Sequence, residues 1–441
     1  MRDGGGSAAK RSWRDALAVY GGRRQFVILA MGFSSGLPLL LGFSTLSYWL
    51  AKDGVSLAAI GGLLAVSTPY ALKFLWAPLF DQVRPPPFFR RLGRRRGWMV
   101  CIQIVLMAAI ALLGLGDPAT GLGYMAVMAL AVAFLSASQD IVIDAYRIEV
   151  LQAHEQGAGA AMTQTGYRIG LLAAGAGAIA LADFIAWAWI YALMAALVAV
   201  GMTAALLGPE PACPQPAADD GTGAPPPARR LAGRLRHAVV EPVAEFLARP
   251  GAVWVLAFVL LYKYGDAVAG AMANPFYHQI GFSGVEIAGV TKVFGVVATL
   301  AGVFAGGALV ARFGTLAALL VGGVLQAVTN LLFAWLAAAG HDIALLALAV
   351  GADNFTGGLG SAAFVAYLSA LCNVAFTGTQ YALLTSLMAL GRTVLAASAG
   401  WLAAELGWVG FFFATTALAV PGLALILWLG RAERTAAAGG T

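Results

Sequence analysis

Charged residues interrupt the long apolar runs of this chain, and their side chains are the ones best suited to chemistry. A charge at the centre of a bilayer costs about 2.5–3.5 kcal/mol, so each is a candidate for binding a proton or a charged ligand. At a rise of about 1.5 Å per residue, the charges nearest the midplane of their runs are Arg168, Lys263, Asp353 and Arg392. The other charges within runs are Lys73, Asp140, Asp266 and Lys292.

Two acids in the second half of the chain are candidates for carrying a proton. Lys263 and Asp266 are spaced i,i+3, so they lie on one helix face and can neutralise each other. That pair is either an internal salt bridge or part of a binding site. Asp353 is the preferred proton carrier because an acid buried at the midplane has few structural reasons to be there. Asp140 and Asp266 are the alternatives.

Glycines follow Asp353 in the stretch 353–360, Asp-Asn-Phe-Thr-Gly-Gly-Leu-Gly. No strand precedes them, so they do not form a dinucleotide-binding loop. They permit either close helix packing or a local break in the helix. Gly166 and Gly170 are predicted to be packing residues as well.

A second group of charges lies at the ends of runs rather than inside them. Asp81 ends the second run and faces an arginine cluster, and Asp140 and Asp144 are followed by an arginine one turn later. We expect these residues to form a charge lock that breaks when the two halves of the protein move; a static structural lock is the alternative. The gating candidates are Asp81, Arg94, Arg95, Arg96, Asp144 and Arg147.

The elements that position these charges are predicted from composition. Hydrophobic residues make up 60% of the 441 residues and charged residues 11%, whereas a soluble domain carries about 25% charged residues. Mean hydropathy is +0.82. Each membrane helix needs about 20 apolar residues, and twelve runs qualify: 26–50, 58–81, 98–116, 121–143, 159–182, 186–208, 251–273, 285–311, 315–338, 343–371, 381–404 and 408–430.

The basic residues place both termini in the cytoplasm. With this orientation nearly all arginines fall on the cytoplasmic side, and only Lys52 falls on the other. This distribution follows the positive-inside rule and requires an even number of spans. The net charge of +6 is therefore a topology signal whose partner is the lipid bilayer, not nucleic acid.

The chain divides into two six-helix halves. The longest polar interruption, 209–250, reads as a cytoplasmic linker whose second part is a candidate interfacial helix interrupted by Pro242. The predicted segments are a cytoplasmic N-terminal segment 1–25, bundles 26–208 and 251–430, the linker 209–250 and a tail 431–441. A phrase at 54–62 recurs at 281–289, and parallel six-helix repeats are typical of the major facilitator fold. Ser283 to Glu286 within the repeat reads as a helix capping box.

Several classes of site are excluded. Cys101, Cys213 and Cys372 fall at cytoplasmic positions without metal spacing, and the four histidines lie outside the runs. No phosphate-binding loop is present. We find no His-Asp or Ser-His pairing at one membrane depth, so we expect no catalytic residues, no metal, no cofactor and no enzyme activity.

Long ordered phrases resemble the muropeptide permeases of the AmpG type. Residues 73–81 read Lys-Phe-Leu-Trp-Ala-Pro-Leu-Phe-Asp and residues 136–145 read Ser-Ala-Ser-Gln-Asp-Ile-Val-Ile-Asp-Ala. Further matching phrases lie at 32–39, 157–161, 166–168, 261–267, 357–366, 371–373 and 379–384. The resemblance runs from about residue 26 to residue 430.

The resemblance implies proton-driven import of anhydro-muropeptides across a bacterial inner membrane for cell-wall recycling. Gly36, Ala137, Gln139 and Asp140 fall in motifs that look functional in that family. Two departures stand out: some members continue into two further helices, and Asp353 stands where relatives are expected to carry Glu. The lysine/tryptophan and Gln-Asp phrases are shared with acetyl-CoA transporters, so those phrases alone do not choose the substrate.

The sequence thus predicts an all-α, multi-pass transporter that works as a monomer, with a small-molecule anhydro-muropeptide and protons as partners. Five basic residues against three acids within the runs favour an anionic substrate. There are two alternatives: an importer of another bulky anion such as acetyl-CoA, and a non-transporting membrane scaffold. The candidate substrate-binding residues are Gly36, Tyr48, Ala137, Gln139, Arg168, Tyr262, Lys263, Asn354, Tyr367 and Arg392. Lys73 and Lys292 either contact substrate or extend to the membrane surface.

Overall fold

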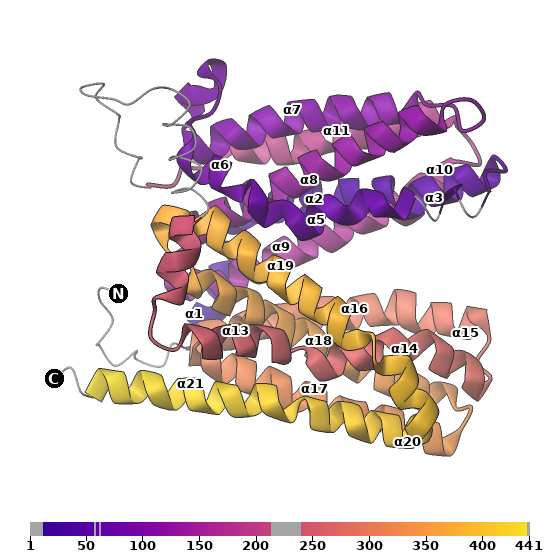
Figure 1. The fold of residues 1–441 in the computed structure, drawn as a ribbon, viewed down its shortest axis with the longest axis vertical. Coiled ribbons are helices and arrows are strands. Elements are labelled where there is room, and N and C mark those ends of the chain that lie inside the picture. Colours follow the sequence, from indigo (N-terminus) through magenta and orange to yellow (C-terminus); the bar gives the residue numbers. More distant parts are fainter. Residues whose placement is uncertain (1–11, 57–58, 61–62, 213–239, 439–441) are drawn as a thin grey trace.

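The computed structural model describes residues 12–56, 59–60, 63–212 and 240–438, and all regular structure in these ranges is helical. Figure 1 shows two helical bundles, one from the first half of the chain and one from the second. They converge at the end where both termini lie, and their ribbons separate toward α3, α10 and α15. The predicted all-helical fold is confirmed.

The first half begins with the short helix α1 (Trp13–Ala18) and the 3₁₀ turn η1 (Val19–Gly21). Its further elements are α2 (Arg23–Gly42), α3 (Ser44–Lys52), η2 (Leu64–Ser67), α5 (Thr68–Leu72), η3 (Lys73–Leu75), α6 (Ala77–Gln82), η4 (Pro87–Leu92), α7 (Arg94–Gly114), α8 (Leu122–Val150), η5 (Ala153–Glu155), α9 (Gln156–Leu172), η6 (Ala173–Gly177), α10 (Ala178–Leu181) and α11 (Trp187–Leu207).

The second half contains longer helices. Its elements are α13 (Ala252–Leu261), α14 (Tyr264–Ile280), α15 (Gly284–Ala288), η7 (Gly289–Phe294), α16 (Gly295–Phe313), α17 (Thr315–Ala339), α18 (Ile343–Leu371), η8 (Val374–Phe376), α19 (Thr377–Ala396), α20 (Ala399–Leu418) and α21 (Val420–Ala438). Nine helical stretches of the described chain are long and apolar enough to cross a membrane. The described residues of the other three predicted runs, 58–81, 159–182 and 381–404, lie mostly in helices that are shorter, more broken or more polar.

Several predicted spans are not single straight helices. The run 26–50 breaks at Phe43, and 251–273 breaks between Leu261 and Tyr264. The run 159–182 contains the π-helical segment η6. The predicted boundary between the last two spans is confirmed: α20 is kinked at Gly407, whose φ is +62°, and this break lies between the predicted runs 381–404 and 408–430. Apolar runs reveal length but not the breaks within it.

Glycines set the closest helix contacts, as predicted for Gly166 and Gly170. A Cβ on Gly166 would meet the carbonyl of Leu29, and one on Gly170 would meet that of Phe33, so α9 packs directly on α2. In the second half, a Cβ on Gly358 would meet the backbone of α16. Helix α18 is unbroken from Ile343 to Leu371. Its glycines therefore serve packing rather than a helix break.

The linker is anchored at each end to a different half. Glu210 accepts hydrogen bonds from the backbone N–H groups of Arg95 (2.8 Å) and Arg96 (3.1 Å) at the start of α7. Residues 240–247 form a helix that contains Pro242. Beyond it, Arg249 pairs with Glu245 at 2.7 Å and donates to the carbonyl of Leu371 at the end of α18. The first part of the predicted interfacial helix lies outside the described residues.

Candidate functional site

A cluster of polar side chains lies inside the second bundle, where the helix of the seventh predicted span breaks. Lys263 sits between α13 and α14, with its Nζ 3.3 Å from Asp266 Oδ2 and 2.8 Å from Gln326 Oε1. The Nε2 of Gln326 donates to Asp266 Oδ1 at 2.6 Å. The predicted Lys263–Asp266 pair is confirmed, and the amide of Gln326 bridges both charges.

Asp353 lies on α18 beside this cluster. The hydroxyl of Thr329, one turn along α17 from Gln326, lies 3.5 Å from Asp353 Oδ1. A small cavity of about 50 Å³ is lined by both Asp266 and Asp353, and by Asn330. The Oδ1 of Asn330 is buried without a hydrogen-bond partner among the described residues. The cavity has room for water beside both acids, and its polar lining supplies partners for it.

The aromatic residues predicted in this bundle belong to its hydrophobic core. Tyr262 donates its hydroxyl hydrogen to the carbonyl of Leu319 at 3.0 Å, and its ring stacks on Phe364. Tyr367 is buried, with its ring edge-on to Phe258. Both tyrosines are therefore held by the hydrophobic core. Asn354 accepts from Thr299 at 2.9 Å and donates to a carbonyl on its own helix.

A second polar cluster lies in the first bundle, around α8. Asp140 accepts a hydrogen bond of 2.6 Å from Ser35 on α2, and Lys73 lies near enough to interact with it electrostatically. Gln139 is fully buried and donates to the carbonyl of Ser34 at 3.1 Å. The cluster therefore ties α8 to α2 and brings Lys73 close to Asp140, which the sequence had only placed in separate spans.

The remaining predicted binding residues are dispersed. Gly36 is buried, and a Cβ there would meet the carbonyl of Tyr167 on α9. Ala137 is fully buried on α8, whereas Arg168 is partly buried on α9. Tyr48 is 40% exposed and packs against Trp187, and Arg392 is exposed on α19. The side chain of Lys292 lies outside the described part of the chain.

The charges at the converging end of the bundles form a buried network. Asp81 Oδ1 lies 2.7 Å from the guanidinium of Arg95, which also pairs with Glu149 of α8. Arg94 lies 3.7 Å from the same glutamate. Arg96 instead donates to the carbonyls of Ala205 and Leu206 on α11. The predicted pairing of Asp81 with the arginine cluster is present, and it runs through Arg95.

Asp81 also joins the two bundles. Its carboxylate accepts from the N–H of Gly378 (3.1 Å), from the N–H of Thr379 (2.7 Å) and from the Thr379 hydroxyl (2.7 Å), all at the start of α19. Side chain and partners are buried. One carboxylate therefore receives four hydrogen bonds, three of them from the other half of the protein.

Arg147 forms a second contact between the bundles. Its side chain is fully buried, lies 3.5 Å from Asp144 and donates to the hydroxyl of Ser369 on α18 at 3.1 Å. The guanidinium also lies over the ring of Tyr381 on α19, 5.4 Å from the ring centre. Arg147 is thus held between α8 and two helices of the other half.

Comparison with known proteins identifies the family. A family model described as Major Facilitator Superfamily matches residues 26–352. The chain is also 41% identical over 413 residues to the anhydromuropeptide permease of Escherichia coli K12, covering 93% of this chain and 80% of that protein. The chain belongs to the AmpG family of the major facilitator superfamily.

Other relatives agree with that assignment. The putative transporter AmpG 4 of Rickettsia felis is 33% identical over 410 residues, covering 92% of this chain and 97% of that protein. The solved structure of the human organic anion transporter MFSD10 (TETRAN) has the same fold, with a TM-score of 0.61 at 16% identity over 94% of this chain and 100% of that one. This AmpG-family chain is therefore a multi-pass membrane transporter rather than an enzyme.

Sequence reasoning missed several members of these clusters in the AmpG-family chain. Gln326 and Thr329 are uncharged, and a search for charges passed over them, although an amide inside an apolar run was a usable signal. Glu149 was passed over although it lies only two residues after the predicted gating residue Arg147. The N–H groups of Gly378 and Thr379 carry no sequence signal at all. By contrast, the predicted capping box is confirmed, with Glu286 accepting from the Ser283 N–H at 2.8 Å.

Proposed function

We propose that this protein is a proton-coupled importer that carries anhydro-muropeptides (GlcNAc-1,6-anhydro-MurNAc and its peptides) from the periplasm to the cytoplasm across the bacterial inner membrane for peptidoglycan recycling. The observation that carries the proposal is the 41% identity, over 93% of the chain, to a protein named anhydromuropeptide permease. The polar clusters inside each bundle support it, because intramembrane charges in transporters mark substrate and proton pathways.

Substrate recognition falls to the polar cluster of the second bundle. A muropeptide stem carries carboxylates, and Lys263 is a partly buried cation whose Asp266 partner is shared with Gln326. A substrate carboxylate meets either Lys263, whose partly buried positive charge it offsets, or the exposed Arg392. To bind a sugar, Gln139, Asn354 and Tyr262 would have to exchange their present contacts with Ser34, Thr299 and Leu319 for the substrate.

Proton coupling falls to Asp353. Its carboxylate lines the same small cavity as Asp266, so a proton on one acid alters the electrostatic field at the other. Protonation of Asp353 reduces the negative charge near Lys263 and leaves the lysine free to bind an anion. Proton and substrate thereby favour each other's binding, which is the requirement for symport.

Alternating access falls to the contacts at the converging end of the bundles. The positive-inside rule assigns that end to the cytoplasm, so the arrangement corresponds to an outward-facing state. Opening toward the cytoplasm requires that Asp81 leave Gly378 and Thr379, and that Arg147 leave Ser369. These groups therefore act as a gate, and the transporter works as a monomer because each half supplies one side of it.

Uptake into proteoliposomes tests the proposal. Purified protein should accumulate a labelled anhydro-disaccharide when the outside is acidic, and the accumulation should collapse when an ionophore removes the proton gradient. Liposomes with Lys263→Ala protein provide the matched control. Preferential uptake of acetyl-CoA would show that the proposed substrate is wrong. Accumulation that does not depend on the proton gradient would contradict proton coupling, and the absence of any saturable uptake would favour a non-transporting scaffold.

A further inference from the structure

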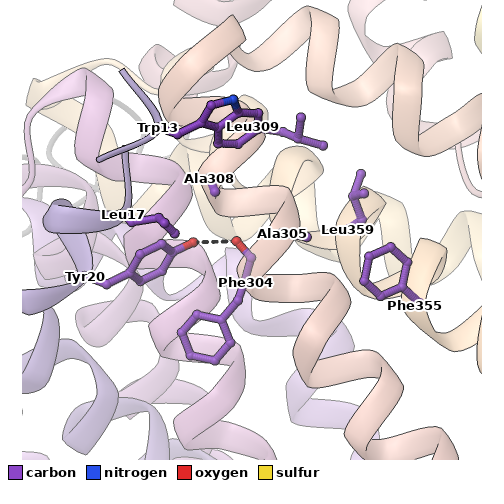
Figure 2. Close-up of a pocket in the computed structure, with 9 residues that line it drawn as sticks. All are labelled: Trp13, Leu17, Tyr20, Phe304, Ala305, Ala308, Leu309, Phe355 and Leu359. Atoms are coloured by element: carbon purple, nitrogen blue, oxygen red, sulfur yellow. Dashed lines mark hydrogen bonds between the residues drawn. The ribbon is translucent and has the colours of Figure 1, made fainter. Parts of the chain in front are cut away.

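An apolar groove lies at the cytoplasmic end of the protein, apart from the polar clusters. It has a volume of about 660 Å³ and runs between α1 with η1 on one side and α16 and α18 on the other. Figure 2 shows apolar side chains around it, including Trp13, Leu17, Phe304, Phe355 and Leu359. The hydroxyl of Tyr20 also lines it, but that group already donates to the carbonyl of Phe304 at 2.8 Å. Apart from the indole N–H of Trp13, the groove therefore offers a ligand apolar contact rather than hydrogen bonds.

A cation lies at the edge of this groove. Arg312, in the last turn of α16, holds its guanidinium 5.3 Å from the ring centre of Trp13 and 5.2 Å from that of Phe313. The Arg312 Nε is buried without a hydrogen-bond partner among the described residues. A buried donor on a charged group is costly to leave unpaired. The position thus favours an anion at one end of an apolar ligand.

The groove also lies at the right depth for a lipid. Helix α1 immediately precedes the first span and exposes Trp13 (49%) and Leu17 (58%), with Arg14 exposed beside them. An exposed tryptophan and arginine on a short helix are typical of the membrane interface. The opening of the groove therefore lies level with the headgroups of the cytoplasmic leaflet.

We propose that this groove binds an anionic phospholipid of the cytoplasmic leaflet, with an acyl chain along the apolar lining and the phosphate at Arg312. A peptide segment would be a poor occupant, because the mostly apolar lining leaves most of its backbone N–H and C=O groups without hydrogen-bond partners. A soluble phosphate would leave the apolar surface uncovered. A phospholipid satisfies both the unpaired donor and the apolar wall, and the bilayer supplies it at high local concentration.

Native mass spectrometry of the protein released from nanodiscs tests this proposal. Protein from discs with equal phosphatidylglycerol and phosphatidylcholine should retain phosphatidylglycerol. Arg312→Gln should reduce that retention about fivefold, the effect of one basic residue near a membrane surface. Ala305→Phe, which fills the groove and keeps the charge, should reduce retention of both lipids. The matched control is Arg84→Gln, which removes an exposed arginine elsewhere on the cytoplasmic side and should change nothing.

Three results would overturn the proposal. The first is equal retention of the two lipids by the unmodified protein, and the second is unchanged retention in both Arg312→Gln and Ala305→Phe. The third is retention that appears only after deletion of residues 2–11, which would make the N-terminal segment the occupant. Arg312→Gln removes the charge and Ala305→Phe fills the groove, so each variant tests the lipid site independently. If one variant fails to fold, the other still decides whether the proposal holds. Melting temperatures of all variants establish which are folded.

Discussion

Replacing Asp81 with asparagine should open the cytoplasmic gate. The asparagine keeps one oxygen, which still accepts from Arg95 and Gly378, but its amide NH₂ takes the place of the oxygen that accepts from Thr379. The Thr379 hydroxyl can turn to accept from the amide. The backbone N–H of Thr379 can only donate, so it and the asparagine NH₂ become two buried donors that face each other.

The size of the effect follows from these lost contacts. A hydrogen bond to a charged acceptor is worth about 1.5–3 kcal/mol, and a stranded buried donor costs about 1–3 kcal/mol. Because the open state relieves the opposed donors, we expect the closed arrangement to lose about 2–4 kcal/mol relative to it. That difference shifts the equilibrium about 30-fold to 1,000-fold. Transport should slow more than substrate binding weakens, since the outward-facing state becomes rare.

Distances between spin labels measure this equilibrium. Arg84→Cys and Val374→Cys, in a background free of native cysteines, place labels on exposed residues of opposite halves at the cytoplasmic end. Asp81→Asn should lengthen the label-to-label distance. Glu149→Gln is the matched control, because that glutamate pairs with arginines of its own half only. Unchanged distances in Asp81→Asn and in Thr379→Val would refute the gating argument.

Four further expectations concern coupling, stability, binding and topology. Asp353→Asn should abolish gradient-driven accumulation in proteoliposomes and spare substrate exchange; retained accumulation would move the proton role to another acid. Asp266→Asn should lower folded yield and melting temperature, because it leaves Lys263 with only a neutral partner, and normal values would contradict this. Lys263→Ala should weaken binding of an anhydro-disaccharide carrying a peptide stem by about 1–3 kcal/mol by calorimetry, whereas unchanged affinity would exclude the lysine from the site. An impermeant thiol reagent outside spheroplasts should label His278→Cys but not Arg94→Cys, and the reverse would invert the topology.

Local contacts were the part of the site that sequence could predict. Lys263 with Asp266, and Ser283 with Glu286, are three residues apart, so helix geometry alone brings them together. Asp81 and Arg95 are separated by one short cytoplasmic connection, and their opposite charges at neighbouring helix ends made the pairing predictable. Composition and charge asymmetry likewise sufficed for the helical class and the two halves.

Contacts between distant segments were beyond sequence reasoning. The Asp81 carboxylate meets backbone N–H groups almost 300 residues away, and every residue except proline carries such a group. The bond from Arg147 to Ser369 depends on how the two bundles meet, which no local pattern encodes. The helix break at Lys263 was hidden for a different reason: apolar composition is the same whether a span is continuous or interrupted.

The anchored ends of the linker have a mechanical consequence. Burial acts to raise the pKa of Glu245, but hydrogen bonds from Arg249, Gln380 and Asn373 outweigh it and lower the pKa, so this anchor persists at neutral pH and weakens only in acid. At the other end Glu210 is fixed to the start of α7, so each end of the linker is held by a different half of the protein. If the proposed gate opens, the contacts of Asp81 and Arg147 between the halves must break, whereas both anchors of the linker lie within single halves and can persist through the whole cycle.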